Sequence, residues 1–404
     1  MHQFPLADGG LLQAPGRGEA LLSRLGFKLG GGALRLTFPN QRDFTVRGEE
    51  PGALADVVVH RWRALRRMIS AGDLGAAEAY MDGDWSSPDL VGVIRLFARS
   101  DMASAQALMG SPVKRAFERL RHWLRANSKR GSKRNIMAHY DLGNAFYGKW
   151  LDPQMVYSSA IWGPGTPDLE TAQAHKLSRI VERLALTGGE RVLEIGCGWG
   201  ALAKKLAREA NAKIAAISLS PSQLEFARSS AAAEGLGESI DFRLQDYRDV
   251  EGTFDRIVSI EMIEAVGEAF LPGYFQTIRS RLPPLGKAVI QAITIAEERY
   301  DGYRRAPDFI QKHVFPGGFL PTLSVLKEQA RQAGLKLTAS ESFGQSYAKT
   351  LAAWRERFDA SWDEIAPLGF DARFKRLWDY YLAYCEAGFA EGAVDVGLYT
   401  LEPA

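Results

Sequence analysis

The sequence predicts an α/β fold, in which a mostly parallel sheet carries helices on both faces and follows a small α+β module. Three observations support this prediction. From about residue 170 onward, helical and strand-like segments alternate, as in parallel sheets joined by crossover helices. One strand, residues 192–195, runs into a glycine-rich turn before a helix-forming segment. With 404 residues, 46% hydrophobic and 24% charged, the chain has room for two domains.

The first part of the chain, residues 1–110, is expected to form the small α+β domain. Short alternating runs such as residues 34–38 indicate strands, and residues 55–71 show helical spacing. Residues 80–85, Tyr-Met-Asp-Gly-Asp-Trp, are typical of a turn. Gly, Asp and Pro cluster between these pieces, which favours a compact unit of its own.

Residues 111–135 are interpreted as a basic amphipathic connector. Between residues 112 and 134 there are nine Lys or Arg and one acid, Glu118, and apolar residues recur at helical spacing. Such a helix can lie on an anionic membrane surface, where each basic side chain contributes about 1 kcal/mol. It can equally dock its apolar stripe on the protein while its charges face water. The sequence leaves both interpretations open.

The alternating segments after the connector define the large sheet and its helices. Helices are expected over residues 169–186, 201–209, 221–234 and 272–281, and strands over residues 191–195, 213–217, 240–244, 254–260 and 287–294. In such sheets the ligand binds beyond the carboxyl ends of the strands. Functional side chains should therefore gather there, in residues 194–200, 218–220, 245–247, 261–264 and 291–294.

The glycine-rich turn is the most specific pattern in the chain. Glu194 ends the buried strand, and Gly196, Gly198 and Gly200 follow at alternate positions. Glycine lacks a β-carbon, so a ligand can approach the backbone of such a turn closely. The spacing differs from the Gly-x-Gly-x-x-Gly fingerprint of dinucleotide-binding proteins. It resembles instead the first motif of class I methyltransferases, which bind S-adenosylmethionine.

Composition limits where the protein is expected to work. The two cysteines, Cys197 and Cys385, argue against a disulfide framework and for a reducing compartment. The N-terminal residues lack a signal-peptide pattern, and no apolar run approaches the ~20 residues that span a bilayer. We therefore expect a cytoplasmic protein whose contact with the inner face of the membrane is peripheral.

Several further segments together resemble one branch of the methyltransferases. They are residues 139–144, 157–162, 217–223, 261–267, 308–312 with 315–321, and 346–350. In this order they are similar to cyclopropane-fatty-acyl-phospholipid synthases and the related mycolic-acid methyltransferases. The resemblance is dense from about residue 135 to the C-terminus and reappears at residues 80–85. It implies a class I methyltransferase domain over residues 136–404, with a Rossmann-like seven-stranded sheet and an acyl-chain-binding insertion around residues 296–322.

The resemblance implies methyl transfer from S-adenosylmethionine to the cis double bond of an unsaturated acyl chain in a phospholipid. A carbocation follows, a bound bicarbonate ion removes a proton, and the cyclopropane ring closes. A homodimer is also expected from the family. Methylation without ring closure is the alternative, and a non-catalytic lipid-binding protein is a more distant one. A nucleic-acid substrate is not expected, because the motifs typical of base methylation are missing.

The resemblance also assigns residues to the cofactor. Gly196, Gly198 and Gly200 match the turn that holds it, after Glu194. Ser218 and Gln223 take the ribose contact, although a helix N-cap explains the same pair. Asp246 and Tyr247 match the adenine site. Tyr157 and Ser158 match residues near the methionine end of the cofactor.

The catalytic assignments rest on the same resemblance. Glu264 and Tyr347 match the bicarbonate pocket, whereas Glu261 is interpreted as an unremarkable surface acid. Ser159 and Gln291 stand where many members of the family have cysteine and histidine, which puts ring closure in doubt. No metal site is expected. Four aromatic side chains are candidates for contact with the acyl chain, although core packing is the simpler explanation of each: Tyr140, Tyr300, Phe309 and Phe315.

Overall fold

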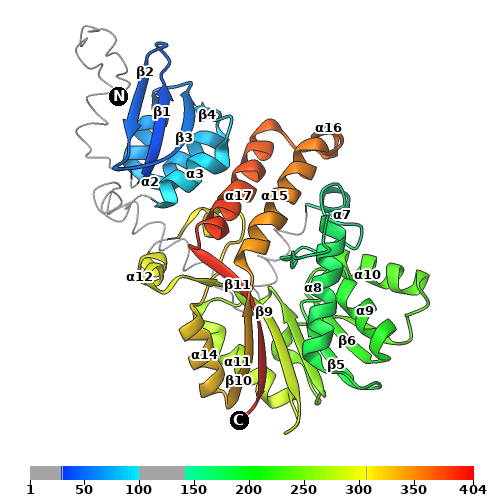
Figure 1. Ribbon diagram of the computed structural model, residues 1–404. Coiled ribbons are helices and arrows are strands. Elements are labelled where there is room, and N and C mark those ends of the chain that lie inside the picture. Colours follow the sequence, from blue (N-terminus) through cyan, green and yellow to red (C-terminus); the bar gives the residue numbers. More distant parts are fainter. Residues whose placement is uncertain (1–28, 30, 100–141, 306) are drawn as a thin grey trace, which may run out of the picture.

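The computed structural model describes residues 29, 31–99, 142–305 and 307–404. The connector predicted at residues 111–135 and the substrate contact predicted at Tyr140 lie outside this part of the chain. Figure 1 shows a small sheet at one end, a large sheet at the other and two long helices, α15 (Gly344–Ala360) and α17 (Ala372–Ala390), between them. None of the helices in the described ranges is long and apolar enough to cross a membrane.

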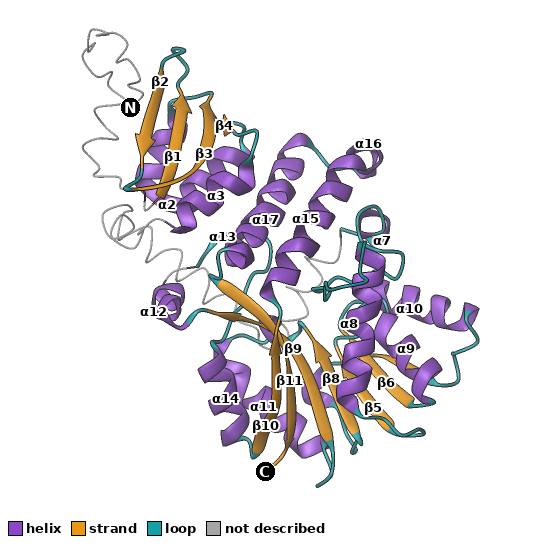
Figure 2. Cartoon of the chain, in the orientation of Figure 1, coloured by secondary structure: helices purple, strands orange, loops and turns teal. Residues whose placement is uncertain are grey.

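The large sheet has seven strands in the order β10-β11-β9-β8-β5-β6-β7 (Figure 2). All neighbouring pairs are parallel except those of β11, which runs antiparallel to β9 and β10. This arrangement confirms the predicted mostly parallel sheet. The strands are β5 (Arg191–Ile195), β6 (Lys213–Ser218), β7 (Ile240–Leu244), β8 (Arg256–Ile260), β9 (Lys287–Ile295), β10 (Leu335–Ser342) and β11 (Val394–Pro403).

Helices cover both faces of the large sheet because successive strand residues point to opposite sides. Val192 packs in one hydrophobic cluster and its neighbour Leu193 in another. The Val192 cluster includes apolar residues of α8 (Leu169–Leu184), α9 (Ala201–Ala210) and α10 (Pro221–Ala233). The Leu193 cluster includes those of α11 (Leu271–Arg281) and α14 (Leu323–Gln332). Helices α8, α9, α10 and α11 lie close to their predicted ranges, whereas no range was predicted for α14.

The small sheet has the order β2-β1-β3-β4, with β1 parallel to β3 and the other pairs antiparallel. The helix predicted at residues 55–71 is wrong in its first part. Ala55, Val57 and Val59 are buried at alternate positions, so this segment is strand β3. The module contains β1 (Gly31–Thr37), β2 (Asp43–Arg47), β3 (Glu50–Val59), α2 (Arg63–Met81), β4 (Trp85–Ser86) and α3 (Leu90–Arg99).

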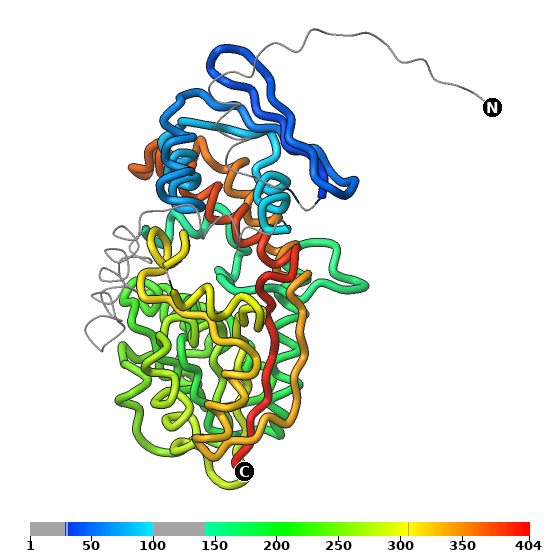
Figure 3. Tube along the Cα trace, turned by 90° about the vertical axis from the view of Figure 1, so that its left-hand side faces the viewer, coloured from blue at the N-terminus to red at the C-terminus, as the bar shows by residue number. Residues whose placement is uncertain are grey.

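Helix α17 connects the two sheets. It contacts α2 and α3 on one side and α15 on the other, and β11 follows it into the large sheet. One hydrophobic cluster extends from Val57 of the small sheet to Trp354 of α15 and Phe146 of α7 (Asn144–Tyr147). In the turned view of Figure 3 the C-terminus lies at the far end of the molecule from β1 and β2.

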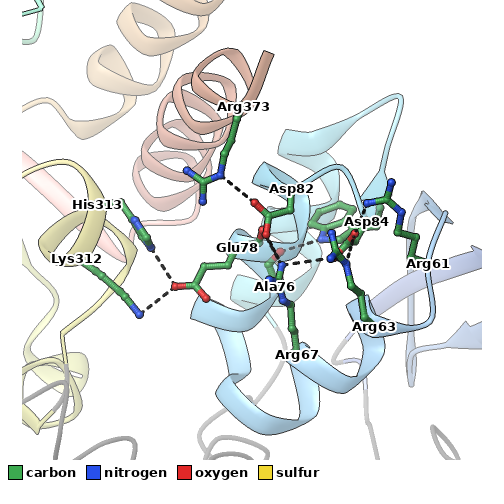
Figure 4. A network of polar contacts seen from close by, with 11 residues as sticks. Arg61, Arg63, Arg67, Ala76, Glu78, Asp82, Asp84, Lys312, His313 and Arg373 are labelled. Atoms are coloured by element: carbon green, nitrogen blue, oxygen red, sulfur yellow. Dashed lines mark hydrogen bonds and ion pairs between the residues drawn. The ribbon is translucent and has the colours of Figure 1, made fainter. Parts of the chain in front are cut away.

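A polar network reinforces the same junction (Figure 4). Asp82, just after α2, accepts a hydrogen bond from Arg373 of α17 at 2.9 Å. Glu78 of α2 lies 3.0 Å from Lys312 Nζ and 3.3 Å from His313 Nε2. These contacts outweigh burial and lower the pKa of Glu78 to about 2. Because Lys312 and His313 belong to α13 (Phe309–His313), the small module contacts the segment predicted to bind the acyl chain.

The remaining helices flank these elements. α12 (Glu297–Arg305) and α13 follow β9, and α16 (Trp362–Ile365) separates α15 from α17. Single 3-10 turns lie at Tyr247–Asp249, Ile263–Ala265, Glu268–Phe270 and Ala366–Leu368. Two of them, at Tyr247–Asp249 and Ile263–Ala265, follow the carboxyl ends of β7 and β8, where the site residues are expected.

Candidate active site

The glycine turn after β5 has the backbone conformation that its sequence predicts. Gly196, Gly198 and Gly200 have φ angles of 84°, 52° and 84°, a region that residues with a β-carbon rarely adopt. A β-carbon at Gly196 would lie 3.0 Å from Met262, and one at Gly200 would lie 3.0 Å from Ala227. One at Gly198 would meet nothing within 4 Å. The turn is thus packed at both ends and open at its centre, as a cradle for a ligand requires.

Glu194 and Lys176 form a buried ionisable pair behind this turn. Glu194 is 3% exposed, and within the described residues its Oε2 atom has no hydrogen-bond partner. Burial raises the pKa of Glu194 to about 8, against the attraction of Lys176. Burial likewise lowers the pKa of Lys176, which is 1% exposed, to about 8. The Lys176 ammonium donates to Ser158 Oγ at 2.8 Å, so it links the predicted cofactor residues Ser158 and Glu194.

At the end of β6, Ser218 and Gln223 contact each other. Ser218 Oγ donates to Gln223 Oε1 at 3.1 Å, and both side chains are buried. The N-cap of α10 is the neighbouring Ser220, whose hydroxyl accepts a hydrogen bond from the backbone amide of Gln223 at 3.4 Å. The capping interpretation therefore belongs to Ser220, and the ribose contact of Ser218 and Gln223 stays a prediction.

After the end of β7, Tyr247 begins the 3-10 turn and Asp246 is its N-cap residue. Asp246 accepts from Arg248 at 2.6 Å, which fixes the carboxylate beside the turn. The Tyr247 ring packs edge-on against Tyr274, with centroids 5.6 Å apart. Burial raises the pKa of Tyr247 to about 12, so the phenol stays neutral and its ring can offer an apolar face. Their predicted adenine contact remains a prediction.

Tyr157 belongs to an aromatic cluster next to the glycine turn. Its hydroxyl lies 2.7 Å from the Tyr381 hydroxyl, and its ring centroid is 5.4 Å from those of Tyr147 and Trp354. Tyr147 in turn packs 5.2 Å from Trp199, inside the glycine motif. The cluster places a wall of rings beside the predicted methionine end of the cofactor.

Glu261 is the centre of a second polar constellation, after β8. Its carboxylate accepts three hydrogen bonds: from the Ser159 backbone amide at 2.8 Å, Gln291 Nε2 at 2.6 Å and the Tyr347 hydroxyl at 2.7 Å. The interpretation of Glu261 as an unremarkable surface acid is therefore wrong. Its φ of 47° is unusual for a residue with a β-carbon, and the backbone turns its side chain inward at a cost of about 1–2 kcal/mol.

Glu264 lies beside this constellation without sharing its donors. Its Oε1 atom accepts from the Ile293 backbone amide at 2.6 Å, and the described residues give Oε2 no partner. Burial first, and then the charge of Glu261, raises the pKa of Glu264 to about 8. The structure thus pairs Tyr347 with Glu261, where the sequence pairs it with Glu264. Ser159, Gln291 and Tyr347 still converge on one point, as predicted residues of one pocket should.

The predicted substrate residues in the described part occupy different settings. Tyr300 of α12 carries the guanidinium carbon of Arg304 5.4 Å from its ring centroid. Phe309 is 3% exposed and packs 4.8 Å from Tyr380, so it is a core residue between α13 and α17. Phe315 lies 6.2 Å from Tyr381, close to the Tyr157 hydroxyl pair. Their contact with an acyl chain remains a prediction.

Comparison with known proteins agrees with this geometry. The sequence model of the family described as mycolic acid cyclopropane synthetase matches residues 127–398. Tuberculostearic acid methyltransferase of Mycobacterium tuberculosis is 38% identical over 388 residues, covering 91% of this chain and 87% of that protein. Cyclopropane-fatty-acyl-phospholipid synthase of Escherichia coli is 35% identical over 352 residues, covering 85% and 86%.

A solved structure shares the same architecture. The mycolic acid cyclopropane synthase CmaA1, complexed with SAH and CTAB, superposes with a TM-score of 0.63 and 28% identity. The match covers 67% of this chain and 98% of that one. The chain belongs to the mycolic acid cyclopropane synthetase family and is an S-adenosylmethionine-dependent methyltransferase that acts on lipids.

Proposed function

We propose that this enzyme methylates the double bond of an unsaturated acyl chain in a membrane phospholipid and closes the product to a cyclopropane. One observation carries the proposal. The glycine turn abuts the acidic segment, because a β-carbon at Gly196 would lie 3.0 Å from Met262, between Glu261 and Glu264. A methyl donor held by the turn would therefore lie next to the constellation of Glu261, Gln291 and Tyr347.

The residues that would hold S-adenosylmethionine lie at the carboxyl ends of three neighbouring strands. They are the glycine turn with Glu194 after β5, Ser218 and Gln223 after β6, and Asp246 and Tyr247 after β7. When bound, S-adenosylmethionine supplies an electrophilic methyl group on a positively charged sulfur. The aromatic rings around Tyr157 suit a cationic ligand, because they present π-faces to positive charge.

The neighbouring side chains suit chemistry on an alkene. A carbocation forms when an alkene accepts a methyl cation, and water must be excluded while it exists. The rings of Tyr147, Tyr157 and Trp354 border the site. They exclude water from it and present π-faces that stabilise positive charge. The acyl chain would enter from a membrane surface to which the enzyme binds peripherally on the cytoplasmic side, past the segment of residues 296–322.

Open-chain methylation is the second candidate, and one observation favours it. The relative that covers 91% of this chain is a tuberculostearic acid methyltransferase, whose name states a methyltransferase and no ring. The Gln291 side chain can donate a hydrogen bond, but unlike histidine it cannot take up a proton and become positively charged. Both candidates share methyl transfer and differ only in which proton the cation loses.

The test uses the full chain, isotopically labelled S-adenosylmethionine and vesicles of unsaturated phospholipid. We expect label in the acyl chain, with a mass gain of one CH2 unit and loss of the olefinic NMR signal. The same mass gain with a surviving double bond would establish open-chain methylation instead. Absence of label from all unsaturated lipids offered would refute both candidates.

A further inference from the structure

We infer that Glu261 is the base that removes the proton from the methylated acyl chain, so that this enzyme needs no separately bound bicarbonate ion. The inference rests on the proposed function, because it concerns the step that follows methyl transfer. It assigns a catalytic residue that family resemblance alone overlooks. It also replaces the expectation, drawn from the family resemblance, that a bound bicarbonate ion fills the pocket.

The hydrogen-bond donors of the pocket already share one acceptor. The Ser159 amide and Gln291 Nε2 both donate to Glu261 Oε1, and the Tyr347 hydroxyl donates to Oε2. Of the residues expected to surround bicarbonate, Ser159, Gln291 and Tyr347 therefore bind a carboxylate of the chain itself. A carboxylate and a bicarbonate ion offer the same pair of acceptor oxygens, so one can stand in the place of the other.

Electrostatics also disfavour a second anion at this point. Bicarbonate near these donors would adjoin the Glu261 carboxylate, and like charges repel strongly where water is excluded. Lys176 acts on Glu261 and attracts its charge, but its ammonium donates to Ser158, behind the pocket. The observed donors and charges fit one carboxylate and do not fit a carboxylate plus an ion.

The two glutamates are arranged to hold different protonation states. Burial raises the pKa of both carboxyl groups, but Glu261 accepts three hydrogen bonds, each of which opposes that rise, whereas Glu264 accepts one, from Ile293. The charge of Glu261 further raises the pKa of Glu264, to about 8. The hydrogen bonds around Glu261 therefore favour its ionised form more than the single hydrogen bond to Glu264 does, and the more readily ionised carboxyl group is the better base.

The proton balance of the step is simple. A C–C bond forms between the alkene and the methyl group as the S–CH3 bond breaks, and S-adenosylhomocysteine takes the electron pair of that bond. The acyl chain is left with one positive charge. Glu261 accepts one proton from the cation, and the released C–H electron pair forms the ring bond or a double bond. The carboxylic acid passes its proton to bulk water before the next turnover.

The test compares the full-length wild type with Glu261→Gln and Glu261→Gly in buffers freed of carbon dioxide, with and without added bicarbonate. We expect the wild type to turn over equally in both buffers. Glu261→Gln should lose about 100-fold or more in kcat, the scale of general-base catalysis, while its affinity for S-adenosylmethionine stays unchanged. Glu261→Gly removes the carboxylate and should regain activity only when bicarbonate is added.

A second readout does not depend on turnover. Binding of 13C-labelled bicarbonate, followed by NMR, should be undetectable for the wild type and measurable for Glu261→Gly. Thermal unfolding verifies that each variant is folded, and Glu251→Gln, at an exposed position between β7 and β8, is the matched control. Bicarbonate bound by the wild type, a bicarbonate requirement of its activity, or near-normal turnover by Glu261→Gln would each overturn the inference. Loss of all lipid methylation in the wild type would instead refute the proposed function.

Discussion

Glu264 and Glu261 stand three residues apart and differ in their hydrogen bonds, and this difference sets how the folded state responds to pH. A carboxyl group whose pKa is raised on folding stabilises the folded state while it is protonated. For Glu264 that contribution is complete below its unfolded value of about 4.3 and is lost as the pH rises through about 8. The sign is therefore opposite to that of an exposed, ion-paired acid.

Replacing Glu264 by glutamine should remove this pH dependence. We expect the free energy of unfolding of Glu264→Gln to rise relative to the wild type between pH 5 and pH 9. The expected gain is about 1–3 kcal/mol, once the partial exposure of the residue is allowed for. Denaturant unfolding at several pH values measures it, with Glu251→Gln, at an exposed position, as control. A difference that stays constant with pH would contradict the raised pKa of Glu264.

The residues that sequence reasoning missed at the site were hidden for physical reasons. Ser159, Gln291 and Tyr347 could be picked out from ordered motifs, and the structure brings them together. Glu261 could not be picked out in this way, because the direction of its side chain depends on a positive φ angle, which the sequence pattern does not predict. Lys176 lies on the buried stripe of α8, with Gln173, Leu177 and Ile180, and a lysine at such spacing was the one available signal.

At the scale of elements, hydrophobic periodicity predicted the helices and strands that bury one face. The strands at Arg191–Ile195 and Ile240–Leu244 match their predicted ranges, because their apolar runs are short and bounded by turn residues. The error at residues 55–71 arose where strand β3, a three-residue connection and helix α2 follow one another closely. Three consecutive valines at 57–59 favour a strand, and the helix begins only at Arg63.

Helix α2 is expected to support the segment that is predicted to bind the acyl chain. Glu78 contacts Lys312 and His313 of α13, so Glu78→Ala would remove the carboxylate that both side chains contact. We expect a loss of about 1–3 kcal/mol in the free energy of unfolding, since these contacts are mostly buried. Steady-state kinetics should show a raised KM for vesicle lipid and an unchanged KM for S-adenosylmethionine.

The matched control for this junction is Glu50→Ala, at an exposed position of β3 in the same small module. It should alter neither stability nor the KM for lipid. If Glu78→Ala changed the two KM values in parallel, or neither of them, α2 would have no specific role in lipid binding. The ion pairs in Figure 4 would then serve only to hold the module in place.

At the scale of the whole molecule, α17 joins the small sheet and the methyltransferase sheet into one body with a continuous hydrophobic cluster. This junction could not be predicted from periodicity, because residues far apart in sequence build it: α2 near residue 80 and α17 near residue 380. The chain between α3 and α7 contains the basic segment of residues 112–134. Its charges are the feature that we propose brings the enzyme to the membrane.

That proposal predicts a charge-dependent affinity for anionic vesicles. Replacing Lys114, Arg115 and Arg119 by glutamine removes three positive charges, each of which contributes about 1 kcal/mol near an anionic surface. We expect vesicle affinity in a flotation or sedimentation assay to fall about tenfold to 100-fold, and the loss to shrink at high salt because ions screen the attraction. Methylation of a detergent-dispersed lipid should be unaffected, since the active site is unchanged.

The matched control removes three exposed charges from α14 and β10: Lys327, Arg331 and Lys336. If net charge alone governed adsorption, both triple variants would lose affinity equally. If only the variant of residues 114–119 did so, the basic segment would be the membrane-binding element. Unchanged binding by that variant would leave the alternative interpretation, a helix docked on the protein with its charges in water. The enzyme would then have to reach its lipid through another surface.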